Sequence, residues 1–314
     1  MKPYRFQNET AKHVLKRLAS QPMFLLADDV GLGKTVVSGI VIERLERRKK
    51  SRHKYRVVYL ASNKRLSAQN APRLLDQLNQ NGPHAAKSST DRIILWAALP
   101  QCRRRIEILP WSVETSFGLS GTGTSEEREW IARALRRVGS KGCPCGRVWK
   151  KIWKEISEVA HVLPRDAVLR KGFVAAVRRG IRVLQREPLP KKCACLKRLR
   201  QAIAWQIVSS SEYRPDLLLC DEFQRYRGSV LPHNVKGKKI SGRELLSNFL
   251  QESKKSNART KVLFVSATPF DVRAQGSGSR GTDGLRRFVS LVSERTAHKV
   301  FGAEEGGHEG IYGR

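Results

Sequence analysis

The chain has 314 residues, enough to bury the core of one large domain or two small ones. Its 61 Lys and Arg residues against 28 Asp and Glu give a formal net charge of +33, which favours an anionic partner, above all nucleic acid. No run of about 18 apolar residues exists, which excludes a membrane-spanning helix. The opening sequence MKPYRFQNET has no apolar signal core, so the sequence predicts a cytoplasmic location with reduced cysteines.

The first segment, residues 1–20, predicts an amphipathic helix. Val14, Leu15 and Leu18 form one apolar stripe, and the sequence PYRFQ, which ends in Gln7, precedes the helix. From the residue pattern alone, Gln7 is as well explained as an exposed residue at the helix start.

Residues 24–35, FLLADDVGLGKT, have the pattern of a phosphate-binding loop. The uncharged run at 24–26 is typical of a strand buried on both faces, and a helical pattern begins near Lys34. Gly31 and Gly33 let the backbone curl so that successive N–H groups point at phosphate oxygens, and the helix start adds partial positive charge. Lys34 would reach the β- and γ-phosphates of ATP, and the Thr35 hydroxyl would bind Mg²⁺.

The chain continues with a second strand at 56–61 and a helix at 66–78, after which the pattern becomes obscure. We expect an insert over residues 82–212. Within it, Ser125 followed by acidic residues indicates a helix start. The glycines just upstream, Gly121 and Gly123, are interpreted as a polar loop that caps this helix rather than as a second phosphate loop.

The second half of the insert is strongly basic. Residues 136–200 hold 19 Lys or Arg and four acidic residues. Such side chains neutralise phosphates, so we expect a nucleic-acid-binding face formed mainly by Lys and Arg. Trp149 and Trp153, spaced i, i+4, would either stack on bases or pack into the core of a helical layer.

All but two of the six cysteines lie in two pairs within this insert, Cys143 with Cys145 and Cys193 with Cys195. Four thiolates from two turns could bind Zn²⁺ tetrahedrally and stabilise an insert that otherwise has a poor core. The C-x-C spacing is not the commoner C-x₂-C, so reduced thiols are the favoured alternative.

Two further apolar strands end in polar residues. The first, in PDLLLCDEFQ (215–224), ends in adjacent carboxylates, where Asp221 would hold Mg²⁺ and Glu222 would polarise the attacking water. The second, in KVLFVSATP (261–269), ends in Ser266 and Thr268.

These motifs, in this order, resemble those of the superfamily-two helicases and translocases of the Swi/Snf-like, DEAD/DEAH type. LADDVGLGKT resembles motif I although Asp28 replaces the first consensus glycine, DEFQ resembles motif II, and SATP resembles motif III. The resemblance implies a RecA-like α/β domain with a central parallel sheet, and ATP and Mg²⁺ as cofactors. It assigns Lys34, Asp221 and Glu222 as catalytic. It implies nucleotide contacts at Gln7, Asp29, Gly31, Leu32, Gly33, Lys34, Thr35 and Val36.

The resemblance has further implications outside the nucleotide site. Gln7 would contact adenine beside Phe6 or Arg5, and residues 61–63 would contact the nucleic-acid backbone, although the usual proline is absent there. Ser266 and Thr268 would couple the nucleotide state to the nucleic acid.

The expected division of the chain follows from these motifs. Residues 1–81 and 213–270 form the RecA-like domain, 82–212 the insert, and 271–314 a Gly-rich flexible tail. The stretch after Pro269 is too short for the second motor domain that supplies an arginine finger. The resemblance therefore implies a nucleic-acid-dependent ATP hydrolase of the helicase or translocase type that acts on DNA and is weak without a second domain or subunit. The alternative is a non-catalytic nucleic-acid-binding protein, or a truncated remnant, that retains an ATP site.

Overall fold

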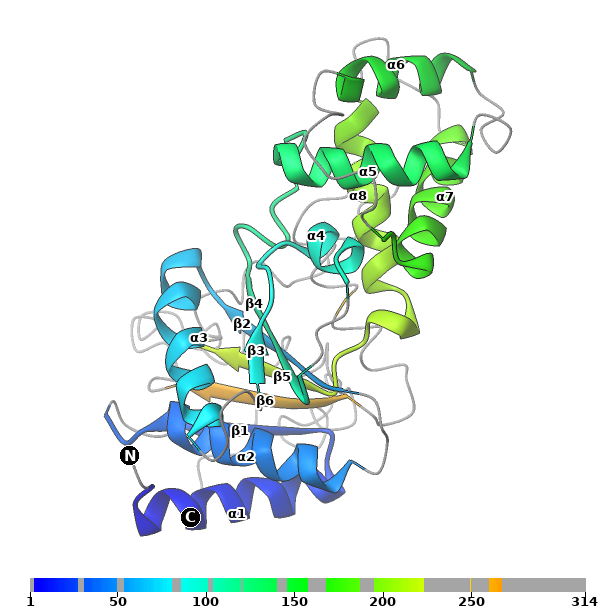
Figure 1. Cartoon of the computed structure of the whole chain (residues 1–314). Coiled ribbons are helices and arrows are strands. Elements are labelled where there is room, and N and C mark those ends of the chain that lie inside the picture. The colour runs from blue at the N-terminus through cyan, green and yellow to red at the C-terminus, as the bar shows by residue number, and fades with distance from the viewer. Residues whose placement is uncertain are drawn as a thin grey trace, which may run out of the picture.

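The structure, a computed structural model of the chain, describes residues 3–27, 31–49, 54–80, 86–100, 104–119, 121–139, 146–157, 168–186, 195–222, 249 and 260–266. Strands and helices alternate in the first half, and a run of helices precedes the last two strands (Figure 1). The strands are β1 (Met23–Ala27), β2 (Tyr55–Ala61), β3 (Ala86–Ser88), β4 (Ile106–Ser112), β5 (Leu217–Asp221) and β6 (Lys261–Ser266). The helices are α1 (Arg5–Ser20), α2 (Lys34–Arg48), α3 (Lys64–Asn79), α4 (Ile93–Ala98), α5 (Ser125–Val138), α6 (Gly146–Ser157), α7 (Lys171–Arg186) and α8 (Cys195–Val208), with a short 3₁₀ turn η2 (Ser211–Tyr213) before β5.

The described strands form one parallel sheet in the order β1-β6-β5-β2-β4-β3. This confirms the predicted α/β class with a central parallel sheet, and it is consistent with a RecA-like domain. The last of the described strands in the sequence, β6, lies between β1 and β5. Since parallel strands end at the same edge, the carboxyl ends of β1, β5 and β6 lie side by side there.

Both faces of the sheet are covered by helices. Along β5, Leu217 and Leu219 join the core beneath α1, α2 and α3, whereas Leu218 and Cys220 join the core formed with α4 to α8. Successive side chains on a strand point to opposite faces, so a strand between two helical layers needs apolar residues at every position. This explains why β5 and β6 are uninterrupted apolar runs.

The expectation of a poor core in the insert is wrong. Its helices bury a continuous set of apolar side chains against the second face of the sheet: Ile131, Leu135, Ile152, Ile156, Phe173, Val177, Ile181, Leu196, Leu199 and Ile203. Trp153 also packs against this core, which favours the packing interpretation of that side chain. The high density of charge conceals these apolar positions on α7, for example, because its described Lys and Arg side chains lie on one exposed face. The division of the chain into domains stays a prediction.

A buried ion pair fixes the start of α5. Thr124 is the N-cap, one residue earlier than the sequence suggests, and its hydroxyl accepts a hydrogen bond from the backbone of Glu127 at 3.2 Å. The carboxylate of Glu127 lies 2.7 Å from the guanidinium of Arg200 on α8, and both residues are only 2% exposed. Gly123 has φ of +94°, and a Cβ there would overlap this pair. The predicted polar loop that caps the helix is therefore confirmed.

Candidate nucleotide-binding site

The phosphate-binding loop has the local geometry that the sequence predicts. Gly31 and Gly33 adopt φ of +91° and +77°, which side chains with a Cβ rarely reach, and Gly33 is the N-cap of α2. Helix α2 begins at Lys34, so its first free N–H groups and the side chains of Lys34 and Thr35 open into the same pocket. A helix start with glycines in this conformation is a place where phosphate oxygens are stabilised by backbone N–H groups.

The two carboxylates reach this pocket from the end of β5. Asp221 is the last residue of the strand, and Glu222, which follows, has φ of +47° and donates its backbone N–H to the Val265 carbonyl of β6 at 2.9 Å. The left-handed conformation is costly for a residue other than glycine, and such strain gathers at functional sites. It turns the chain at the edge of the sheet so that both carboxylates line the pocket.

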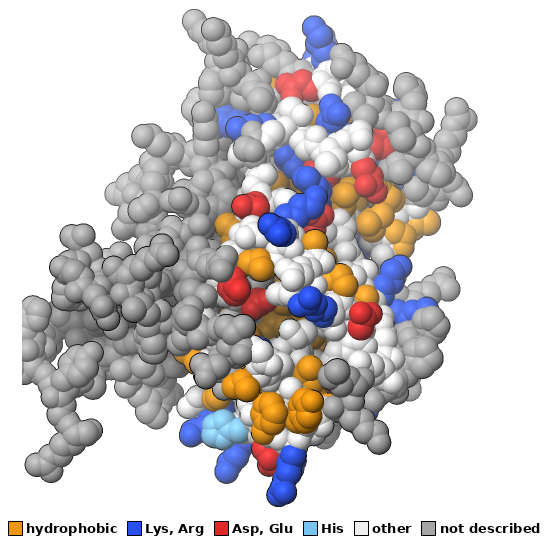
Figure 2. Space-filling view, turned by 90° about the vertical axis from the view of Figure 1, so that its left-hand side faces the viewer, with side chains coloured by type: hydrophobic (Ala, Val, Ile, Leu, Met, Phe, Trp, Pro, Cys, Tyr) orange, Lys and Arg blue, Asp and Glu red, His pale blue; other side chains and the backbone are white. Residues whose placement is uncertain are grey.

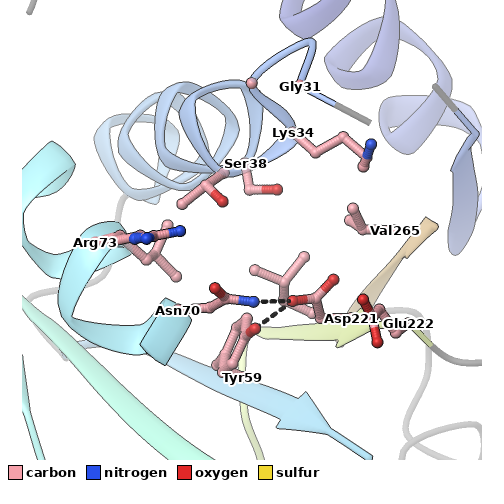
Figure 3. A pocket seen from close by; sticks show the side chains of 13 residues that line it. Gly31, Lys34, Ser38, Tyr59, Asn70, Arg73, Asp221, Glu222 and Val265 are labelled. Atoms are coloured by element: carbon pink, nitrogen blue, oxygen red, sulfur yellow. Dashed lines mark hydrogen bonds between the residues drawn. The ribbon is translucent and has the colours of Figure 1, made fainter. Parts of the chain in front are cut away.

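Two side chains hold Asp221 in place. Asn70 on α3 donates its amide N–H to the Oδ2 of Asp221 at 3.0 Å, and the Tyr59 hydroxyl donates to the same oxygen (Figure 3). Burial, and after it the negative charge of Asp221, raises the pKa of Tyr59 above its ordinary value, so the phenol stays protonated and remains a donor. Because Oδ2 accepts both hydrogen bonds, Oδ1 is the oxygen of Asp221 that could bind a cation.

Gln7 is buried, only 5% exposed, and so is not an exposed residue of the helix start. Its carbonyl accepts the backbone N–H of Tyr4 at 3.0 Å, and its amide donates to the backbone carbonyl of Leu32 at 3.3 Å. A Cβ on Gly33 would overlap this amide. Gln7 therefore ties α1 to the phosphate-binding loop, while its predicted contact with adenine stays a prediction.

The pocket has a volume of about 300 Å³ and gathers residues from five elements and the turns beside them. Its lining comprises Gly31, Gly33, Lys34, Thr35, Ser38, Tyr59, Asn70, Arg73, Leu74, Leu219, Asp221, Glu222 and Val265. In Figure 3, Lys34 and the two carboxylates lie on one side of the space, and Arg73 reaches in from α3 on the other. Oxygen ligands of the kind offered by Thr35 and Asp221 fit Mg²⁺.

Several predicted residues lie beside the pocket rather than in its lining. Val36 packs against the core under α1 to α3, and the Leu32 side chain is exposed at the turn. Ser266, the predicted coupling residue, is buried at the end of β6, next to Val265 of the lining. Asn63, in the segment predicted to contact nucleic acid, caps α3 by accepting the Leu66 backbone N–H at 2.9 Å.

Other predicted residues fall outside the described part of the chain: Asp28, Asp29, Thr268, Cys143, Cys145 and Cys193. Cys195 is described and lies buried at the start of α8. Within the described residues no group of three or more His, Cys, Asp or Glu side chains is arranged to bind a metal. The zinc site therefore stays a prediction.

Sequence reasoning missed four polar residues of the lining: Ser38, Tyr59, Asn70 and Arg73. Tyr59 carried a signal, because its hydroxyl lies within the otherwise apolar residues 57–61 of β2. Asn70 carried another, since asparagine is a weak helix former in the middle of a helix. Neither signal says which partner the side chain meets.

No family model matches this chain, and no curated protein matches it. Among solved structures, a nuclease-deletion mutant of the Type ISP restriction-modification enzyme LlaGI, in complex with a DNA substrate mimic, is similar to it with 14% sequence identity and a TM-score of 0.35. That likeness covers 86% of this chain and 18% of the LlaGI chain, so the chain spans less than a fifth of the enzyme's length. Such a TM-score carries no argument about function. Along the described residues, no helix is both long and apolar enough to span a membrane.

Proposed function

We propose that this chain binds ATP with Mg²⁺ and hydrolyses it in response to nucleic acid, as a motor domain of the superfamily-two helicase and translocase type. One observation carries the proposal. The glycine turn with Lys34 and Thr35 and the pair Asp221 and Glu222, far apart in the sequence, line the same pocket at the carboxyl edge of the sheet. Chance acidic pairs and chance glycine turns do not converge in this way.

Each residue has a role that follows from its chemistry. The backbone N–H groups after Gly33 and the ammonium of Lys34 bind phosphate oxygens. Thr35 and Asp221 bind Mg²⁺, which supplies charge neutralisation at the phosphates. Glu222 orients and polarises the water that attacks the terminal phosphate. Ser266, buried at the end of β6 beside Val265 of the lining, couples the nucleotide state to the nucleic acid.

The test is ATP hydrolysis by the purified chain, with and without DNA, beside Glu222→Gln and Lys34→Ala variants. The expected result is turnover that rises with DNA and is lost in Glu222→Gln, which still binds ATP. Lys34→Ala should lose ATP binding and keep its affinity for DNA. Failure of the wild-type chain to bind Mg²⁺-ATP at all would refute the proposal, and loss of both ATP and DNA binding in Lys34→Ala would indicate misfolding instead.

A further inference from the structure

Helix α7 presents an exposed basic face, defined here as Lys171, Arg178, Arg179 and Arg182. Its opposite face is buried against the helical layer through Phe173, Ala176, Val177, Ile181 and Leu184. Lys171, Arg178 and Arg182 follow each other at i, i+7 and i+11, which puts them in one row along the helix, with Arg179 beside them. The four side chains are exposed because packing requires only the other side of the helix.

Among the described residues, Glu212 lies against Gly172 at the start of α7, and no acidic side chain is paired with this face. Neither α7 nor α8 contains an acidic residue, and the acid of α6, Glu155, accepts the Leu196 backbone N–H at 3.2 Å. On α5, Glu127 and Glu129 are buried in ion pairs with Arg200 and Arg133. Nearby Glu212 lies 3.8 Å from Arg170. In the part of the chain that the structure describes, the α7 basic face forms no ion pair.

The face lies away from the nucleotide pocket. In Figure 1, α7 is at the right of the molecule, while the carboxyl ends of β1, β5 and β6 point to the left. Figure 2 shows that on the left-hand side basic and acidic side chains are interspersed along the described surface. The described side chains on that side therefore do not form an uninterrupted basic patch.

The dimensions and composition of the face suit one kind of polyanion. From Lys171 to Arg182 the helix rises about 16 Å, a length over which a duplex presents a phosphate about every 3.4 Å on each strand. Single-strand sites add aromatic side chains on which bases stack. Here Phe173 is fully buried, and Trp153 and Trp205 pack against the core. The exposed large apolar side chains of the described residues include no aromatic residue on α5 to α8.

We propose that the α7 basic face binds the phosphate backbone of duplex nucleic acid, without reading its sequence, as an anchor separate from the nucleotide pocket. This inference rests on the proposed function for its choice of a nucleic-acid partner. It specifies duplex rather than single-stranded nucleic acid and names the residues that contact it. It also predicts that the affinity of the α7 basic face for duplex is the same with and without ATP.

The test compares two variants of the full chain that each lose two positive charges from exposed helix positions. Arg178→Ala with Arg182→Ala removes two of the three residues of the row. Lys16→Ala with Arg17→Ala on α1 is the matched control, since α1 covers the other face of the sheet. Alanine preserves helix propensity, so both variants should fold. Affinity for a fluorescent blunt duplex and for one of its strands is measured by anisotropy over a series of salt concentrations.

The expected result is a loss of duplex affinity in the α7 variant of at least about fivefold at low salt. The slope of log affinity against log salt should fall by up to about 1.8, since each phosphate contact contributes about 0.9. The control should match the wild-type chain, and single-strand affinity should change by less than about twofold. Equal affinities in the two variants, or an equal loss on duplex and single strand, would overturn the inference alone. A wild-type chain that binds no nucleic acid would overturn the nucleic-acid part of the proposed function with it.

Discussion

The hydrogen bonds that Tyr59 and Asn70 donate to Asp221 lead to a prediction about Mg²⁺. Both donors contact Oδ2, so they fix the rotation of the carboxylate and leave Oδ1 directed at the cation. Asn70→Ala removes one donor without adding a charge, and Tyr59→Phe removes the other while keeping the ring. Each variant lets the carboxylate rotate and leaves the remaining donor to hold it alone.

The expected magnitude follows from what outer-shell partners contribute at metal sites. Removing a hydrogen bond to a charged acceptor costs about 1.5–3 kcal/mol, and loss of an outer-shell partner lowers metal affinity by about 10- to 100-fold. Tyr59 is buried and Asn70 half-buried, so Tyr59→Phe should have the larger effect. The double variant should lose less than the sum of the two, because both donors stabilise one oxygen.

The assay is nucleotide binding measured with a fluorescent ATP analogue as Mg²⁺ is titrated, and again with a chelator present. We expect a higher Mg²⁺ requirement in both variants and unchanged affinity in the chelator. Gln69→Ala, an exposed position next to Asn70 on α3, is the matched control and should behave as the wild-type chain does. If affinity falls equally with and without Mg²⁺, the two residues support the fold and not the metal, and the reasoning is wrong.

Three further predictions concern stability and the loop. Glu127→Gln should lower the free energy of unfolding by about 3–5 kcal/mol in urea, and more than Arg200→Met, because Arg92 at 3.8 Å can still pair with Glu127. Gly33→Ala should abolish nucleotide binding in the same fluorescence assay with only a modest fall in Tm, since the strain is local. Burial raises the pKa of Tyr213 to about 12, so the stability that its neutral phenol provides is complete below pH 10 and lost by pH 12. Between pH 10 and pH 12, the free energy of unfolding of Tyr213→Phe should therefore fall by about 2–3 kcal/mol less than that of the wild-type chain, as measured by denaturant titration.

The strands and the phosphate-binding loop could be predicted because each depends on a short stretch of sequence. The run at 217–220 is apolar at every position, which only a strand covered on both faces requires. Gly31, Gly33 and Lys34 specify a loop whose backbone conformation is local. Asp221 and Glu222 could be assigned because they follow such a strand directly.

The partners of those residues could not be predicted in the same way. Asn70 meets Asp221 only because α3 packs against β2 and β2 pairs with β5, a strand about 160 residues later in the sequence. The buried contact between Glu127 and Arg200 likewise joins α5 to α8. The core of the insert could not be predicted from its overall charge, because the number of Lys and Arg residues does not show which side of a helix they occupy. On α7 they lie on one face, and the apolar residues lie on the opposite, buried face.

The position of β6 between β1 and β5 has a consequence for synthesis of the chain on the ribosome. Strand β1 and the loop that follows it emerge early, yet they are joined to the rest of the sheet only through β6, the last described strand in the sequence. Domains with such long-range pairing fold slowly and expose unpaired strand edges while they wait. Until residues 261–266 have left the ribosome, the nascent chain cannot bring Lys34 and Asp221 into one pocket. If the proposed function holds, nucleotide can stabilise this protein only after nearly all of the described chain has been made.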